Sequence, residues 1–86
     1  MLIQFKKKAR KAISEMDKPT KKRIKSAIEG LTHTPPEGDI KQLQGYKDGR
    51  MRLRVGQYRI IYRYDKDGTV EILLILDIGA RGDIYK

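Results

Sequence analysis

Cysteine is absent from the 86-residue sequence. Its absence excludes a disulfide framework, a cysteine-based zinc site and a thiol nucleophile, and it fits a reducing compartment such as the cytoplasm. Long apolar runs are also absent, since no stretch approaches the roughly 20 apolar residues that span a membrane. Residues 1–5 are too few for the apolar core of a signal peptide. We therefore expect one cytoplasmic domain over residues 1–86.

Acidic residues are in the minority, with 11 Asp and Glu against 20 Lys and Arg, and the net charge is +9. In a domain of this size, such an excess favours a polyanionic partner: a nucleic acid, an anionic membrane or an acidic protein. The single histidine, His33, falls in an expected loop at residues 32–39, and we assign it no role.

The first third of the chain has the pattern of a short strand followed by two helices. Ile3 and Phe5 alternate with a polar residue, as in a strand. Apolar residues then recur at helical spacing up to Met16, where Asp17-Lys18-Pro19 interrupts them, because the residue before a proline avoids the helical conformation. A second amphipathic pattern follows at Ile24, Ala27, Ile28 and Leu31. The short connection predicts an antiparallel helical hairpin.

Three further strands are expected, at residues 51–55, 58–64 and 70–78. Gly56-Gln57 suits a type II′ hairpin turn, and Asp67-Gly68 marks a second tight turn. The last strand is almost uniformly apolar, as expected for burial on both faces. The predicted fold class is therefore α+β, with a short N-terminal strand, a two-helix antiparallel hairpin and a three-stranded antiparallel meander that carries the helices on one face.

The first predicted hairpin gathers arginines on one face. If Gly56-Gln57 is the turn, Arg54 lies opposite Arg59, and the alternation of side chains along strands groups five arginines with Ile61 and no carboxylate: Arg50, Arg52, Arg54, Arg59 and Arg63. Like charges opposite each other destabilise a sheet by about 0.2–1 kcal/mol per pair. Guanidinium groups, however, bind phosphate through paired hydrogen bonds and stack on bases. The pattern therefore predicts a surface for a phosphodiester backbone.

Two alternatives apply to this surface. Arginines of a merely solvated face would cover apolar surface with their stems, and a bulge or a register slip would change which residues share the face. The helices add lysines that form either a solvated face or a grip on RNA phosphates, among them Lys6, Lys7, Lys22 and Lys25. The tail supplies Arg81 and Tyr85. Tyr85 is either an aromatic cap on the core or a residue that stacks on a base or transfers a proton.

Residues 43–45, 50–62 and 78–85 together resemble the RelE/ParE superfamily of type II toxin–antitoxin toxins. The most specific part is the arginine–x–glycine–x–tyrosine–arginine core from Arg54 to Arg59. The resemblance covers nearly the whole chain and implies the same fold with a concave basic face. It also implies a toxin that an acidic antitoxin neutralises, with no metal and no cofactor.

The superfamily has two activities, and the residues favour one of them. RelE-like members cleave mRNA on the ribosome by attack of a 2′-hydroxyl on the adjacent phosphate, whereas ParE-like members inhibit DNA gyrase. The resemblance assigns the catalytic positions of the first branch to Arg50, Arg52, Arg59, Arg81 and Tyr85. We expect Arg54 and Arg63, with Lys6, Lys7, Lys22 and Lys25, to bind RNA, although Arg54 and Tyr58 also resemble framework residues.

The chain departs from the family pattern at positions that matter for proton transfer. Some relatives carry lysine where Arg50 and Arg52 stand, and many carry histidine or lysine where this chain has Ala80. Arginine does not give up its proton, so no general base is evident. Catalysis would then depend on positioning and on charge stabilisation, with help from Tyr85 or the ribosome. A gyrase inhibitor and a catalytically weakened relative are the alternatives.

Overall fold

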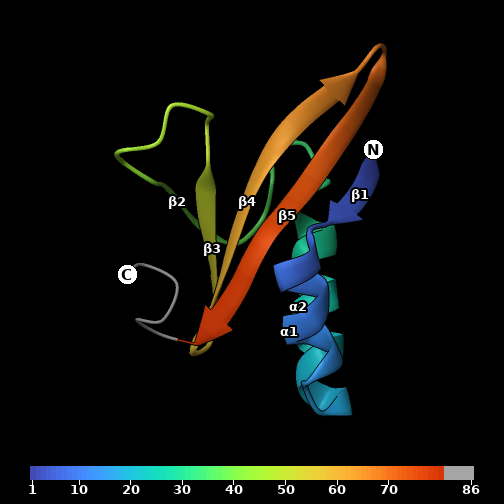
Figure 1. Ribbon diagram of the computed structural model, residues 1–86, viewed down its shortest axis with the longest axis vertical. Coiled ribbons are helices and arrows are strands. Elements are labelled where there is room, and N and C mark those ends of the chain that lie inside the picture. The colour runs from blue at the N-terminus through green and yellow to red at the C-terminus, as the bar shows by residue number, and fades with distance from the viewer. Residues whose placement is uncertain (81–86) are drawn as a thin grey trace.

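The computed structural model describes residues 1–80 as two helices and five strands (Figure 1). The predicted site residues Arg81 and Tyr85 lie outside this described part. In chain order the elements are β1 (Leu2–Phe5), α1 (Lys7–Ser14), α2 (Lys18–Gly30), β2 (Asp39–Gln42), β3 (Met51–Val55), β4 (Tyr58–Asp67) and β5 (Val70–Ala80).

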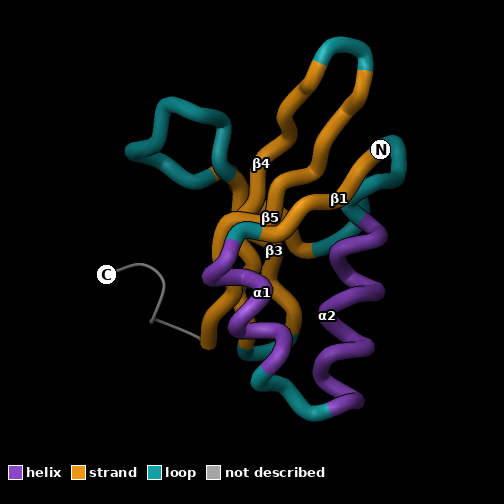
Figure 2. Tube along the Cα trace, turned by 45° about the vertical axis from the view of Figure 1, so that its right-hand side comes forward, coloured by secondary structure: helices purple, strands orange, loops and turns teal. Residues whose placement is uncertain are grey.

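The five strands form one mixed sheet in the order β1-β5-β4-β3-β2. β1 runs parallel to β5, and the other pairs are antiparallel. Both helices lie on one face of the sheet (Figure 2), so the predicted α+β class is confirmed. The predicted meander corresponds to β3, β4 and β5. β2 was not predicted from the sequence, and it adds an edge strand beside β3.

The helical hairpin forms where the sequence predicted it. Asp17 has an extended backbone conformation, and Pro19 occupies the first turn of α2, where a missing N–H costs no helical hydrogen bond. The apolar stripes of the two helices, Ala9 with Ile24 and Ile28, are buried against the sheet. On the sheet side the core contains Leu53, Ile60, Tyr62, Leu73, Ile75 and Ile78.

A β-bulge interrupts the pairing of β4 with β5. Ile61 lies opposite Asp77 but its neighbour Tyr62 lies opposite Ile75, so Leu76 is the extra residue on β5. Because of this extra residue, Ile75 and Ile78 both face the helices and are buried, although they are three positions apart. A bulge also bends the strand and increases its twist, which favours a curved sheet.

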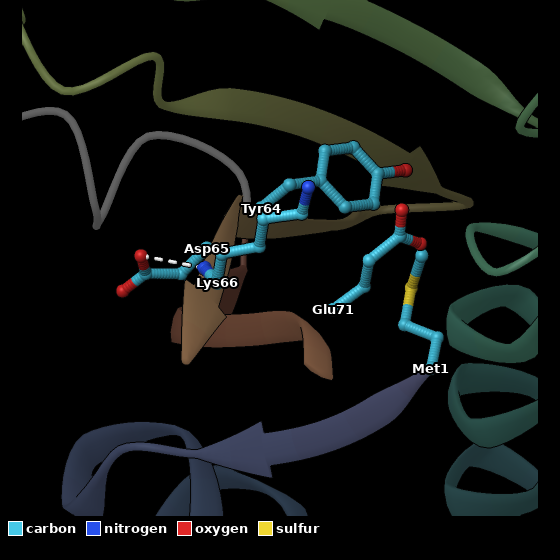
Figure 3. Close-up of a pocket in the computed structure, with 5 residues that line it drawn as sticks. All are labelled: Met1, Tyr64, Asp65, Lys66 and Glu71. Atoms are coloured by element: carbon cyan, nitrogen blue, oxygen red, sulfur yellow. Dashed lines mark hydrogen bonds between the residues drawn. The ribbon is translucent and has the colours of Figure 1, made fainter. Parts of the chain in front are cut away.

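The β4–β5 hairpin extends past the helices at one end of the molecule (Figure 1). The hydroxyl of Tyr64 donates a hydrogen bond of 2.7 Å to the carbonyl of Leu31, at the end of α2, which ties the hairpin to the helical layer. Figure 3 shows the hollow beside this contact, where Glu71 and Met1 point toward the ring of Tyr64. The hollow has a volume of about 450 Å³, and its charges are mixed, since Asp65 and Lys66 complete the lining.

Candidate nucleic-acid interface

The register of β3 and β4 places arginines on the face away from the helices. Arg54 pairs with Arg59 and Arg52 pairs with Ile61, as predicted from the Gly56-Gln57 turn. Gly56 has a φ of +59°, the left-handed conformation that the first position of this turn requires. Because Leu53 and Ile60 face the core, their neighbours point the other way. We call the surface formed by Arg50, Arg52, Arg54, Arg59 and Arg63 the arginine face.

The prediction that this face has no carboxylate is wrong. Asp39, the first residue of β2, lies opposite Arg54. One of its oxygens is 3.4 Å from Nη2 of Arg52, and the other is 3.8 Å from Nε of Arg54. Asp39 therefore lies between two arginines and lowers the repulsion between them. Asp39 was predicted to lie in the loop of residues 32–39, whereas it begins the edge strand β2.

A second carboxylate comes from the loop that joins β2 to β3. Asp48 accepts a hydrogen bond of 2.9 Å from Nη2 of Arg50, with Nε of the same guanidinium 3.3 Å away. Nε of Arg63 lies 3.8 Å from Asp48, and Nη1 of Arg63 lies 3.7 Å from Asp65. The hydrogen bond from Arg50 lowers the pKa of Asp48, and the same bond raises the pKa of Arg50.

Two adjoining hollows on this face are lined by arginines. The first has a volume of about 460 Å³ and runs along β2, with Arg52 and Arg59 in its wall beside Lys41, Gln42, Leu43 and Gln44. The second, about 360 Å³, lies at the turn and is lined by Arg54, Gly56, Gln57 and Arg59. Because Arg59 lines both, we call them together the arginine groove. Their positive walls suit a chain of phosphates.

Arg52 occupies an unusual place in the groove. Its side chain is only 11 % exposed, and its Nε is buried with no hydrogen-bond partner among residues 1–80. A buried donor without a partner costs free energy, and the same guanidinium is also paired with Asp39 through its Nη2. The Arg52 side chain is therefore largely enclosed in the wall of the groove.

A smaller hollow of about 170 Å³ adjoins the groove on the other side of Leu43. The guanidinium carbon of Arg50 lies 4.3 Å from the ring centroid of Tyr46, and Nζ of Lys8 lies 3.7 Å from a carboxylate oxygen of Asp77. Leu43, Ile61 and Leu76 complete the lining. Tyr46 and Asp77 were not among the predicted site residues, and Lys8 was predicted only as one of the basic residues on the helices. A signal for Asp77 existed, because it is the one charged residue in the otherwise apolar run 72–78.

The predicted lysines do not join the arginine face. Lys22 and Lys25 lie on α2, where with Lys18 and Lys21 they line a shallow hollow of about 330 Å³, and the helices cover the opposite side of the sheet (Figure 2). Lys6 and Lys7 are exposed at the start of α1. The described chain thus has two basic surfaces, one on each side. Within residues 1–80, no helix is long and apolar enough to cross a membrane.

The chain matches a known family over almost its full length. Residues 3–85 match the family described as ParE toxin of type II toxin–antitoxin system, parDE. A comparison with curated protein sequences gives no significant match.

Solved structures share the fold. A chain of the archaeal RelE–RelB complex from Pyrococcus horikoshii OT3 is 27 % identical with a TM-score of 0.71, over 95 % of this chain and 96 % of that one. A chain of the RelB–RelE antitoxin–toxin complex from Methanococcus jannaschii is 28 % identical with a TM-score of 0.68, over 99 % and 95 %. The YoeB/ParE toxin from Agrobacterium tumefaciens, at 18 % identity, has the same fold, with a TM-score of 0.78 over 94 % and 99 %.

The family match over residues 3–85 and the shared fold of the solved structures agree with each other. The chain therefore belongs to the ParE toxin family, and it is a type II toxin–antitoxin toxin of the RelE/ParE superfamily.

Proposed function

We propose that this toxin is a ribosome-dependent endoribonuclease that cleaves mRNA. The observation that carries the proposal is the arginine groove, in which Arg52 and Arg59 line one hollow from neighbouring strands. Two planar guanidinium groups on adjacent strands can bind successive or shared phosphate oxygens through paired hydrogen bonds. An extended single strand of RNA fits such a groove better than a globular substrate does.

The proposed reaction is a transesterification without metal. The 2′-oxygen attacks the adjacent phosphorus, the bond from phosphorus to the 5′-oxygen breaks, and the products are a 2′,3′-cyclic phosphate and a free 5′-hydroxyl. One proton leaves the 2′-hydroxyl and one is delivered to the 5′-oxygen. Arg52 and Arg59 hold the phosphate in line and stabilise its extra negative charge, and Arg50 binds a neighbouring phosphate.

The remaining roles rest on the family resemblance. Arg81 would stabilise the charge of the transition state, since arginine keeps its proton. Tyr85 would orient the nucleophile, stack on a base or transfer a proton; both residues lie outside the described residues. Arginine cannot act as a general base at neutral pH, so proton removal from the 2′-hydroxyl would need Tyr85 or a ribosomal group. This requirement supports cleavage on the ribosome over cleavage of free RNA.

We further propose an acidic antitoxin as the inhibitor of this cytoplasmic toxin. The net charge of +9 and two basic surfaces provide electrostatic complementarity, which accelerates association and selects partners. The solved relatives from Pyrococcus horikoshii and Methanococcus jannaschii are complexes of RelE with RelB. An antitoxin that covers the arginine groove would exclude RNA from it directly.

The decisive experiment is induction of the toxin from a tightly controlled promoter, followed by mapping of mRNA ends on stalled ribosomes. Wild type should produce new 5′-hydroxyl ends within codons at the ribosomal A site, whereas Arg59→Ala and Arg52→Ala should not. Lys22→Ala, on the helical side, is the matched loss of charge and should still cleave. Full toxicity of both arginine variants would contradict the proposal.

The second candidate function is inhibition of DNA gyrase, because the matching family is described as that of ParE toxins. The same induction separates the two. Arrest of DNA replication before protein synthesis, with no new mRNA ends, would establish the gyrase function. An inactive protein would identify a catalytically weakened relative, as the absence of histidine or lysine at Ala80 allows.

A further inference from the structure

We propose that the small hollow beside the arginine groove binds one nucleobase of the RNA and prefers guanine. This base pocket is lined by Lys8, Leu43, Tyr46, Arg50, Ile61, Leu76 and Asp77. The inference rests on the proposed RNA substrate and adds a specificity-determining site to it. The pocket combines the three features that recognition of a single-stranded base requires: a planar surface for stacking, an apolar floor and a polar group that can read the base edge.

The planar surface is the pair formed by Tyr46 and Arg50. Tyr46 is 48 % exposed, although a large aromatic side chain on a loop usually gains from burial. The guanidinium of Arg50 lies over its ring at 4.3 Å, and Asp48 fixes that guanidinium through its hydrogen bond of 2.9 Å. A base that stacks on this pair would add a third planar layer, and stacking of this kind contributes to binding whatever the base.

The floor of the pocket is apolar. Ile61 is only 5 % exposed although it lies on the arginine side of the sheet, and Leu43 and Leu76 are half-buried. The volume of about 170 Å³ leaves room for one planar ring system. The β-bulge contributes directly to this floor, because its extra residue, Leu76, lines the pocket. Leu76 lies between Ile75 and Ile78, which face the helices.

The polar edge is Asp77, whose carboxylate is held in a defined orientation. One oxygen accepts a hydrogen bond of 2.9 Å from the backbone N–H of Ile78, and the other lies 3.7 Å from Nζ of Lys8. An ionised carboxylate only accepts hydrogen bonds, and its two oxygens have about four sites for them. Asp77 therefore has capacity left for a ligand that donates.

Guanine matches this pair of charges best. Its Watson–Crick edge presents two adjacent donors, N1–H and the N2 amino group, which can both reach one carboxylate, and its O6 can accept from a lysine. Adenine and cytosine offer one amino group next to an acceptor nitrogen, and uracil offers a single N–H between two carbonyls. Asp77 would therefore bind guanine with two hydrogen bonds and the other bases with fewer.

The pocket is placed to read a nucleotide next to the bound phosphates. Arg52, Ile61 and Asp77 form one row across β3, β4 and β5, so the groove and the pocket share a line of residues. Leu43 lines both hollows. A strand whose phosphate lies at Arg52 can therefore turn a neighbouring base into the pocket without a change in the sheet.

The test measures binding of the purified full chain to pentauridylate and to the same RNA with a central guanosine, inosine or adenosine. Wild type should prefer the guanosine oligonucleotide over pentauridylate by roughly five- to a hundredfold, the discrimination of one bidentate contact. Inosine, which lacks the N2 amino group, should fall between them. Asp77→Asn should abolish the preference, whereas Asp67→Asn, with the same change of charge at the end of β4, should retain it.

The ratio of two affinities is the readout, because a general effect of charge or of partial unfolding cancels in it. Tyr46→Ala should weaken all four oligonucleotides, and Tyr46→Phe should restore their binding. Equal affinity of wild type for the four RNAs would overturn the base pocket and leave the RNA-binding groove intact. An unchanged preference in Asp77→Asn would overturn the assignment to Asp77. Failure to bind any of the oligonucleotides would overturn the proposed RNA substrate as well.

Discussion

Arg54 and Arg59 lie directly opposite each other on β3 and β4, and Asp39 lies opposite Arg54 on β2, the other neighbour of β3. The carboxylate is 3.8 Å from Arg54, so it offsets part of the repulsion between two like charges without removing either guanidinium from the surface. This arrangement retains positive charge at the groove at a small cost in stability. Such a cost is expected where a sheet is selected for binding and not for stability alone.

Replacement of Arg59 should separate the stability of the sheet from its affinity for RNA. In Arg59→Ala the like-charged pair is gone, so the free energy of unfolding should change little or rise by about 0.2–1 kcal/mol, while affinity for RNA falls. Arg59→Lys should keep the long-range attraction but lose the paired hydrogen bonds, and its affinity should be intermediate. Urea denaturation and RNA titration of the three proteins check this. A strongly destabilised Arg59→Ala would indicate a structural role.

The salt dependence of RNA binding should identify the basic surface in use. For a single strand, the slope of log affinity against log salt is about −0.7 per neutralised phosphate. Loss of a groove arginine, as in Arg52→Ala, should make the slope shallower by about 0.7. Lys25→Ala, on the opposite side of the molecule, should leave it unchanged. A shallower slope in Lys25→Ala alone would place the RNA on the helices.

Asp48 should titrate below its ordinary pKa of 3.8 because Arg50 donates a hydrogen bond to its carboxylate. A depressed pKa in the folded state means that the ionised form is favoured by folding. The resulting stabilisation is therefore present above the pKa of the unfolded chain and is lost as the pH falls through the folded value. A carbon-detected NMR titration should give a midpoint under 3.8 for Asp48, and Arg50→Ala should raise it. A midpoint that does not move in that variant would exclude Arg50 as the cause.

Loss of the hydroxyl should affect protein stability differently at two neighbouring tyrosines. The rings of Tyr62 and Tyr64 meet edge to face with centroids 5.7 Å apart. The Tyr62 hydroxyl is buried without a hydrogen-bond partner in the described part of the chain, so Tyr62→Phe should leave stability unchanged or raise it by about 1 kcal/mol. Tyr64→Phe removes the hydrogen bond to Leu31 and should cost about 0.5–1.5 kcal/mol. Equal effects in thermal unfolding would contradict the assignment.

The sequence predicted those parts of the fold that local pattern controls. The two helices and the β3–β4 register follow from apolar spacing and from one glycine at a turn, and both are confirmed. β2 was not predicted because Asp39–Gln42 contains a single apolar residue, Ile40. This segment is a strand because it pairs with β3. The parallel pairing of β1 with β5 joins segments at opposite ends of the chain. Local periodicity predicts that each is a strand but not that the two pair.

The candidate site was predictable to the same extent and for the same reason. Alternation placed Arg52, Arg54 and Arg59 on one face correctly. The acids that partner them, Asp39 and Asp48, come from an edge strand and a loop whose positions depend on tertiary pairing. The base pocket depends on long-range packing, because Lys8 comes from α1 and Asp77 from the far end of the chain. Arg81 and Tyr85 stay predictions.

Leu76 separates two properties of a strand that are usually determined together: which way its side chains point and how far it bends. If this residue were deleted, the side chains of Ile75, Asp77 and Ile78 would alternate regularly between the two faces of the sheet. Ile61 would still pair with Asp77 and Tyr62 with Ile75, now without a register shift between them. Every remaining side chain would keep its side, while the local bend would be lost. The shortened protein should fold around the same core but bind RNA more weakly on a flatter surface. Relatives with and without an extra residue at this position would then have the same side chains on the binding surface but different sheet curvature, and they would bind their ligands with different affinities.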